Sequence, residues 1–414
     1  MSDARSLCRC SPMSAEVGVW PAWAATRAAF GVALLTVHAV AAKVLPTDVS
    51  VVYFNAAHAL VHGLVPYVDF SYEYPPGSLP VLALAWLLGG HTPTSFVVVW
   101  SLLMLGADAL IVRALTRLRF ARRAAFGWII GVCLVGPAAL LRNDLLAVAA
   151  FVVAFTLTAR KLSARGGAVW AFGALAKVWP LAPLAAFILL KRPGRWALAA
   201  GAGAVFALTA AFLLAQGAVG AMVTNLAGRQ GHRPIEIESS WATAVWIKAL
   251  ITGDPVRVQY TFGSFNLTGA YSVTVVATAL TVAAEVGCAV LPVLLARRAA
   301  TPITAAVLAW TFALYVSVTL LVAPVLSAQY ALWLLGAACV VLGVEQYSRA
   351  RTFAVASLAA CGFTQLVYPG LFTQLQHGND WAITALIIRN VTLGFACAMA
   401  VSGLRRCVAS PAQP

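Results

Sequence analysis

The chain has 414 residues, of which 62% are hydrophobic and only 10% are charged, with 28 Lys and Arg against 13 Asp and Glu. Soluble domains carry about 45–50% apolar and about 25% charged residues. This composition therefore excludes a soluble enzyme, a disordered chain and a nucleic-acid-binding protein. The mean hydropathy of +0.88 instead predicts an all-α polytopic membrane protein, with room for about ten to twelve spans in one bundle.

Ten apolar runs are long enough to predict membrane-spanning helices. In chain order they are 24–44, 94–112, 124–141, 145–160, 196–215, 270–296, 301–322, 329–344, 352–368 and 382–404. A further apolar run, 79–90, is too short to cross a bilayer at a rise of 1.5 Å per residue. The run at 168–190 is long enough, but Lys177 and Pro180 interrupt it.

The clusters of Lys and Arg between these runs predict the topology, because cytoplasmic loops are enriched in positive charge. If all clusters are cytoplasmic, 79–90 is an interfacial or re-entrant helix, and 168–190 is a broken hairpin with Lys177 near its tip. If 79–90 crossed instead, the arginines from Arg113 to Arg123 would lie outside, so we prefer the first topology. Both termini are then cytoplasmic, and residues 1–414 form a single membrane domain.

This topology collects the acids on the outer face, where two long loops carry most of them: loop A (45–93) and loop B (216–268). Chemistry by proton transfer needs titratable groups, so we expect the functional site on this face. Of the 13 acids, eight lie there: Asp48, Asp69, Glu73, Asp144, Glu236, Glu238, Asp254 and Asp380.

Loop A begins with a predicted interfacial helix that starts at Thr47 or Asp48 and ends at Gly63. His58 and His62 fall on one side of this helix. Asp48 has two equally good interpretations at this point. It is either the cap of the helix or a carboxylate held at the membrane surface as a general base.

The next part of loop A brings three tyrosines and two carboxylates together: Tyr67, Asp69, Tyr72, Glu73 and Tyr74. Aromatic rings stack on the faces of sugars, and carboxylates accept hydrogen bonds from sugar hydroxyls, so this composition suits a sugar site. Tyrosines also favour the headgroup region of a membrane, which leaves a simple anchoring role open.

Loop B contains a dense group of charged residues: Arg229, His232, Arg233, Glu236 and Glu238. Arginine is suited to bidentate recognition of phosphate. The alternative is a surface loop in which the Arg and Glu side chains neutralise one another. Glu236 and Glu238 alternate with isoleucines, which predicts a short extended segment with one polar face.

Isolated polar residues inside apolar runs are the remaining candidates. A charge at membrane depth costs about 2.5–3.5 kcal/mol, so Lys177 is either a phosphate ligand or a side chain that reaches to the headgroups. Gln329 and Tyr330 open a span and line an outward cavity or anchor the span. For Asp108 and Glu285, hydrogen bonding between helices is as good an explanation as function.

Metal and cofactor motifs are absent from the sequence, which has no HExxH, Walker loop, dinucleotide fingerprint or DxD. Cys8 and Cys10 could bind a metal, but no second pair accompanies them. We therefore expect no metal and no cofactor. Because no two cysteines fall in a candidate outer loop, we also expect no structural disulfide.

With these motifs, the chain resembles glycosyltransferase family 87 of the GT-C fold, the actinobacterial polyprenyl-phosphate-mannose-dependent mannosyltransferases. The resemblance runs through most of the chain and implies that Asp48 is the general base. Many GT-C enzymes pair two acids in the first loop, whereas here Asp48 is the only acid of loop A before Asp69, so the roles of Asp69 and Glu73 stay open. The matching residues are Asp48, Gly63, Pro66, Tyr67, Tyr72, Tyr74, Pro75, Arg142, Asn143, Asp144, Ala176, Lys177, Pro180, Arg233 to Ser239, Ser327, Gln329 and Tyr330.

Together, the residues and the resemblance predict an inverting glycosyltransferase at the outer face of the cytoplasmic membrane. It would move a sugar, with mannose as the first choice, from a polyprenyl-phosphate donor to a glycolipid or lipoglycan acceptor. Asp48 would be the catalytic base, and Lys177, Arg229 and Arg233 would bind the donor phosphate. The expected substrate-binding residues are His58, Tyr67, Asp69, Glu73, Tyr74, His232, Glu236, Glu238, Gln329 and Tyr330.

Two rival functions have different sequence expectations. A transporter or lipid flippase would carry charges along the bundle at mid-depth and show repeat symmetry between its halves, and the sequence shows neither feature. A structural subunit without chemistry would leave Lys177 and the acid-rich outer loops unexplained.

Overall fold

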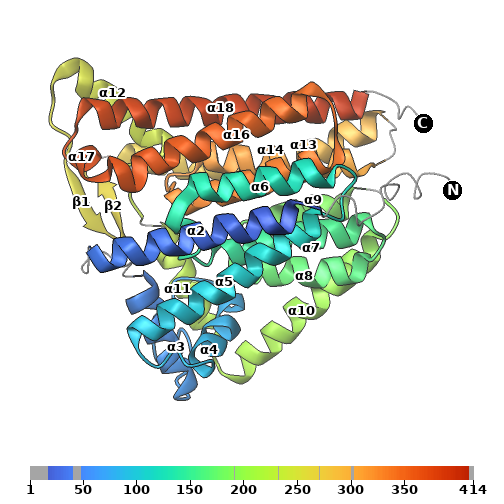
Figure 1. Ribbon diagram of the computed structural model, residues 1–414, viewed down its shortest axis with the longest axis horizontal. Coiled ribbons are helices and arrows are strands. Elements are labelled where there is room, and N and C mark those ends of the chain that lie inside the picture. Colours follow the sequence, from blue (N-terminus) through green and yellow to red (C-terminus); the bar gives the residue numbers. More distant parts are fainter. Residues whose placement is uncertain are drawn as a thin grey trace.

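A computed structural model of the chain describes residues 17–40, 48–190, 192–231, 233–269, 271–299 and 303–409. Within these residues the regular structure is helical apart from one two-stranded sheet. Most of the long helices follow the long axis of the molecule and pack side by side as a bundle (Figure 1). The structure thus confirms the predicted all-α polytopic architecture.

The elements follow one another with short connections. The α-helices are α2 (Val19–Val40), α3 (Phe54–Val61), α4 (Leu79–Leu87), α5 (Pro93–Leu115), α6 (Ala121–Val135), α7 (Asp144–Ala159), α8 (Ser163–Ala176), α9 (Leu181–Leu189), α10 (Arg195–Ala215), α11 (Val219–Gly231), α12 (Ser240–Thr252), α13 (Tyr271–Ala299), α14 (Ala305–Val322), α15 (Ala331–Val344), α16 (Ser348–Gln365), α17 (Phe372–Gln376) and α18 (Asp380–Ala409). Short helical turns are η2 (Asp48–Tyr53), η3 (Pro76–Ser78), η4 (Gly136–Ala139), η5 (Ala328–Tyr330) and η6 (Leu366–Gly370), and the strands are β1 (Val258–Thr261) and β2 (Ser264–Leu267).

Six helices of the described chain are long and apolar enough to cross a membrane, which makes the chain a multi-pass membrane protein. They are α5, α10, α13, α14, α16 and α18. Each of the ten predicted spans coincides with a helix, since α2, α6, α7 and α15 account for the other four. The predicted interfacial helix of loop A is also present as η2 and α3, and Gly63 follows it with a positive φ of 84°.

Of the two ambiguous apolar runs, 79–90 forms one short helix and 168–190 is interrupted. α4 has only nine residues. α8 ends at Ala176, where Lys177 adopts an extended backbone with φ −152° and ψ 134°, and α9 begins after Pro180. The predicted break at Lys177 is therefore confirmed. The cause is Pro180, which has no backbone N–H to donate and whose ring clashes with the carbonyl group four residues earlier in a helix.

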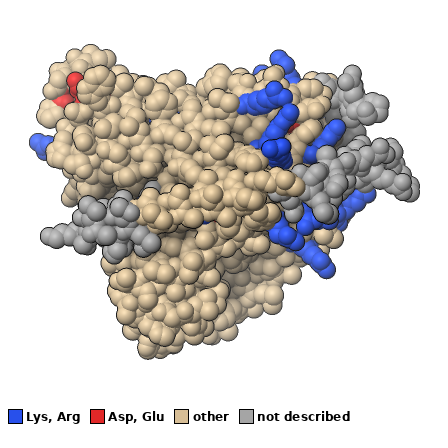
Figure 2. Space-filling model, viewed as in Figure 1, with Lys and Arg blue, Asp and Glu red and all other residues tan. Residues whose placement is uncertain are grey.

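Charge is distributed unevenly along the bundle axis. Figure 2 shows Lys and Arg gathered at one end of the molecule, the end where α2 begins and α18 ends in Figure 1. We call this the basic end. The opposite end, which carries α12, α17 and the two strands, is called the hairpin end. The face between them in Figure 2 is almost free of charged side chains, as a lipid-covered surface requires.

A close crossing joins α8 to α10. A Cβ atom added to Gly167 would lie 2.0 Å from the carbonyl oxygen of Leu198, and one added to Gly201 would lie 1.9 Å from that of Ala164. Only glycine allows backbones to approach so closely, which is how small residues promote helix association in membranes. This crossing fixes α8, the helix that ends directly before Lys177.

A buried ion pair holds three helices of the first half together. The guanidinium of Arg27 in α2 donates to Asp108 in α5 at 2.8 Å, and the indole nitrogens of Trp23 and Trp128 each donate to the same carboxylate at 2.6 Å. Arg27 and Asp108 are 6% and 0% exposed. Of the two roles left open for Asp108, the structure shows hydrogen bonding between helices.

Loop B folds into a cap at the hairpin end, around a second apolar core that includes Ile235, Ile237 and Trp246. Backbone hydrogen bonds of 3.0 Å and 2.8 Å pair Ile237 and Ile235 with β2, so the predicted extended segment is confirmed. Its predicted polar face is not solvent-exposed, however, since Glu236 and Glu238 are only 5% and 2% exposed. Strands β1 and β2 themselves were not expected from the sequence.

Candidate functional site

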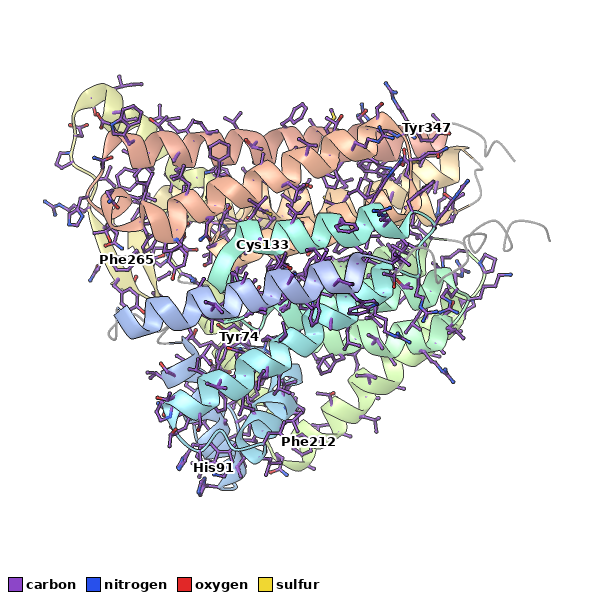
Figure 3. All side chains as sticks on the ribbon, in the orientation of Figure 1. Tyr74, His91, Cys133, Phe212, Phe265 and Tyr347 are labelled. Carbon is purple, nitrogen blue, oxygen red and sulfur yellow. The ribbon has the colours of Figure 1, made fainter. Side chains whose placement is uncertain are left out.

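The tyrosines of loop A are held against the broken end of α8. A Cβ atom added to Gly77 would lie 2.5 Å from the backbone carbon of Leu175, so the loop approaches the end of α8 as closely as a backbone can. The hydroxyl of Tyr67 donates to the carbonyl of Tyr74 at 2.7 Å and fixes the loop. Tyr74, labelled in Figure 3, therefore lies beside Lys177, with its ring centroid 4.6 Å from the ammonium.

Lys177 forms an ion pair with Asp144, the first residue of α7. Its Nζ lies 3.2 Å from Asp144 Oδ2, while Trp333 Nε1 donates to Oδ1 at 2.8 Å. The ring of Tyr330 lies 5.4 Å from the ammonium on another side. Lys177 is thus enclosed by two rings and a carboxylate, and it does not reach out to the surface as the alternative interpretation required.

Asp48 forms a second ion pair, with Arg142, at the start of η2. Its side chain is 25% exposed and that of Arg142 is 20% exposed, so both remain within reach of a ligand. The residues directly before Asp48 lie outside the described chain, so the predicted start of the helix at Thr47 or Asp48 stays a prediction. The carboxylate of Asp48 contacts a guanidinium from the segment between α6 and α7.

A third acid–base group comes from the cap. Ser327 Oγ lies 2.9 Å and 3.1 Å from the two carboxylate oxygens of Glu236, and Arg233 donates to Ser264 Oγ at 3.2 Å. Burial raises the pKa of Glu236, while the charge of Arg233 and the hydrogen bond from Ser327 oppose the shift. Loop B therefore contributes one acid and one base beside Tyr330.

These three groups meet around Lys177 and Tyr330. The positive charges of Arg142 and Arg233 both act on the Lys177 ammonium. The same two cations, together with Asp144 and Glu236, act on the Tyr330 hydroxyl. We call the six charged residues the charge cluster: Asp48, Arg142, Asp144, Lys177, Arg233 and Glu236. Its three acids balance its three bases.

Buried polar atoms next to the charge cluster lack hydrogen-bond partners within the described chain. They are Nδ2 and Oδ1 of Asn143, which is 1% exposed, and Nε of Arg233. Each such atom costs about 1–3 kcal/mol, and folded proteins leave few of them. Asn143 stands between Arg142 and Asp144 in the chain, so the unsatisfied amide belongs to the same segment as two cluster residues.

Several predicted site residues have partners elsewhere. The ring of His58 stacks on that of His62 and contacts Trp86, and Asp69 accepts a hydrogen bond from its neighbour Val65 at 2.7 Å. The buried Glu238 lies 3.5 Å from Arg389 of α18, and burial raises its pKa to about 8 although Arg389 opposes the shift.

Of the other predicted residues, two are described by the structure and two are not. Glu73 is half-buried and its charge acts on Tyr74, and Gln329 is buried next to Tyr330. His232 and the side chain of Arg229 lie outside the described residues. Their predicted roles in substrate and phosphate binding are therefore not placed by the structure.

Four residues of the site were not on the predicted site list: Arg142, Asn143, Asp144 and Trp333. Arg142, Asn143 and Asp144 had a usable signal, because a run of three polar residues follows an apolar segment there. Trp333 had none, since it is 189 residues from its partner Asp144.

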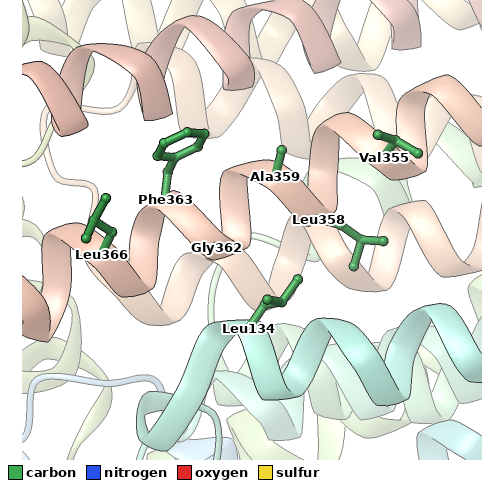
Figure 4. A pocket seen from close by; sticks show the side chains of 7 residues that line it. All are labelled: Leu134, Val355, Leu358, Ala359, Gly362, Phe363 and Leu366. Atoms are coloured by element: carbon green, nitrogen blue, oxygen red, sulfur yellow. The ribbon is translucent and has the colours of Figure 1, made fainter.

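An apolar groove lies apart from the charge cluster. It has a volume of about 480 Å³ and is lined by Leu134 of α6, by residues of α16 from Val355 to Phe363, and by Leu366 of η6 (Figure 4). All of its lining side chains are apolar, so it has no group that could take part in proton transfer.

The cluster combines a partly exposed carboxylate, Asp48, with three cations and two neighbouring tyrosine rings. Such a set can bind an anion and accept a proton. In the residues that the structure describes, no group of three His, Cys, Asp or Glu side chains is arranged to hold a metal ion. In comparisons with known proteins, no family model matches the chain and no curated protein matches it.

Proposed function

We propose that the chain is an inverting glycosyltransferase that uses a polyprenyl-phosphate sugar, with mannose as the first choice, and a glycolipid or lipoglycan acceptor. One observation carries the proposal. The charge cluster joins an accessible carboxylate, Asp48, to the cations Arg142, Lys177 and Arg233 inside a membrane protein.

The cations suit a donor whose leaving group is a phosphate. When the bond between the sugar and the phosphate breaks, negative charge develops on the phosphate oxygens. The positive charges of Arg142 and Arg233 act on Lys177, so the three cations would together stabilise that charge once the donor is bound. The unsatisfied Nε of Arg233 is a free donor for such an anion.

Asp48 suits the role of general base. It would accept the proton of an acceptor hydroxyl while that oxygen attacks the anomeric carbon and the polyprenyl phosphate leaves on the opposite side. Its 25% exposure allows the acceptor to approach. Asp144 is less suited to this role, because Lys177 and Trp333 already occupy its two oxygens.

The charge distribution supports an orientation in the membrane. Because cytoplasmic segments are enriched in Lys and Arg, we assign the basic end to the cytoplasm together with both termini. The hairpin end then faces outward from the cytoplasmic membrane, with Asp48 next to it. A lipid-linked donor and a lipid-linked acceptor would both reach the cluster from the surrounding bilayer.

Purified full-length protein in lipid vesicles with labelled polyprenyl-phosphate mannose tests the proposal. Release of polyprenyl phosphate together with transfer of the label to a glycolipid acceptor is the expected result, and Asp48→Asn should abolish it. Movement of the intact donor between leaflets, without cleavage, would identify a flippase instead. Neither reaction, from well-folded protein with glycolipid acceptors present, would favour a structural subunit.

A further inference from the structure

The proposed base is already engaged in this structure. Arg142 pairs with the Asp48 carboxylate, yet the proposed reaction requires that carboxylate to accept a proton from the acceptor. Arg142 is also one of the three cations available for the donor phosphate. The same guanidinium is therefore the partner of two anions, the Asp48 carboxylate and the donor phosphate. The inference drawn from this rests on the proposed function.

We propose that Arg142 is shared, pairing with Asp48 when the site is empty and with the donor phosphate when the donor is bound. Binding of the phosphate then releases the Asp48 carboxylate to act as base. The planar fork of a guanidinium matches both carboxylates and phosphates, so Arg142 can exchange its contact with Asp48 for a contact with the phosphate. The donor thus binds first and makes the base available.

The neighbouring acids show why Asp48 is the one that loses its partner when the phosphate binds. Asp144 is 1% exposed in its side chain and is held by both Lys177 and Trp333. Glu236 is held at both oxygens by Ser327. The pair of Asp48 with Arg142 is more exposed than these, at 25% and 20%, so water and ligand can reach it.

The charge balance of the cluster also supports the release of Asp48 when the phosphate binds. The charge cluster holds three acids and three bases, so an entering phosphate makes it negative by at least one unit. Repulsion between the phosphate and the carboxylates then acts on all three acids, and the least restrained carboxylate moves. Arg142 can turn to the phosphate because its side chain is 20% exposed and lies near enough to Lys177 for its charge to act there.

A double-mutant cycle tests the shared arginine without requiring catalysis. The affinity of the full-length protein for farnesyl phosphate is measured by calorimetry in four forms: the unmodified protein, Asp48→Asn, Arg142→Gln and the double variant. Asp48→Asn should bind about tenfold more tightly, because Arg142 is freed, and Arg142→Gln about tenfold more weakly. In the Arg142→Gln background, Asp48→Asn should change the affinity by less than about twofold.

Asp254→Asn is the matched control, since it removes the same charge from an exposed turn where Asp254 contacts Thr252. Its affinity should equal that of the unmodified protein. Thermal unfolding checks each variant, and Asp48→Ser replaces Asp48→Asn if the amide folds poorly. Arg142→Lys, which keeps the charge but loses the fork, should fall between the unmodified protein and Arg142→Gln.

Two different failures can be told apart. If the unmodified protein binds farnesyl phosphate but Asp48→Asn gains no affinity, or gains as much without Arg142, the sharing of Arg142 is wrong and the proposed function stands. If the unmodified protein binds no farnesyl phosphate and transfers no sugar, the proposed function is wrong, and the shared arginine is wrong with it.

Discussion

Two Arg–Asp pairs in this protein have the same chemistry and different surroundings. Asp108 is fully buried and accepts hydrogen bonds from three side chains, those of Arg27, Trp23 and Trp128. Asp48 is 25% exposed and contacts Arg142 next to Asn143, whose side-chain amide has no partner in the described chain. The first pair is complete without a ligand, and the second is not.

This difference teaches how to separate structure from function when both use buried charge. A complete, dry ion pair joins α2, α5 and α6, and breaking it leaves an uncompensated charge in the bundle. An incomplete, partly exposed pair contributes less to stability but can exchange partners. Substitutions in the two pairs should therefore affect different measurements.

The largest expected effect is the loss of transfer in Asp48→Asn. A general base contributes typically 10²–10⁴-fold, so the rate should fall about 10³-fold. The unfolding temperature should hardly change, because the pair is partly exposed. Label transfer from polyprenyl-phosphate mannose and thermal unfolding measure the two quantities. Near-normal transfer in a folded variant would exclude Asp48 as the base.

The next effect concerns the buried pair. Asp108→Ala leaves Arg27 charged and unpaired inside the bundle, which should destabilise the protein by about 3–5 kcal/mol. A second change, Arg27→Met, should recover part of that loss because it removes the uncompensated charge. Unfolding temperature and yield of folded protein report both variants. Equal stability of the single and double variants would contradict this role for the pair.

A smaller loss of transfer is expected for Lys177→Met. Removing one preorganised cation should lower kcat/KM about 10²-fold, and Lys177→Arg should retain part of the activity. The variant also leaves Asp144 without its cation, so Lys177→Met with Asp144→Asn serves as the control for that charge. If the double variant recovers full activity, Lys177 acts only as the partner of Asp144.

The smallest effect is a pH dependence of stability from Glu238. Its pKa of about 8 lies above the ordinary value of 4.5, so the folded protein binds the proton more tightly than the unfolded chain. This contribution is complete below about pH 4.5 and is lost as pH rises through about 8. Between pH 6 and 9 the unfolding temperature should therefore fall more steeply than in Glu238→Gln. Parallel curves would show that Glu238 does not titrate in this range.

The sequence predicted the bundle well because membrane helices are encoded locally. Each of the ten apolar runs became a helix, and the break at Lys177 followed from Pro180. The hairpin of β1 and β2 was missed because each strand has four residues and its turn, Phe262 and Gly263, has no Asn-Gly signal. Short strands of this kind depend on the tertiary core beneath them.

The site was predicted in part, for a different physical reason. Lys177, Arg233 and Glu236 stood out as charges in an apolar chain, and the structure brings them to one cluster. Residues that meet only in the folded structure cannot be recognised as partners from the sequence around them. Arg389 lies 151 residues from Glu238, and its position inside an apolar run gave no indication that it would bind the cap.

The contact between Arg389 and Glu238 also sets an order for biosynthesis. Loop B is synthesised long before α18, and Arg389 donates to the backbone carbonyl of Glu238 only once this last helix is in place. A nascent chain that ends before Asp380 already contains Asp48, Arg142, Lys177 and Arg233, but its cap lacks the anchor. The cap therefore depends on a helix that is synthesised after every residue of the charge cluster.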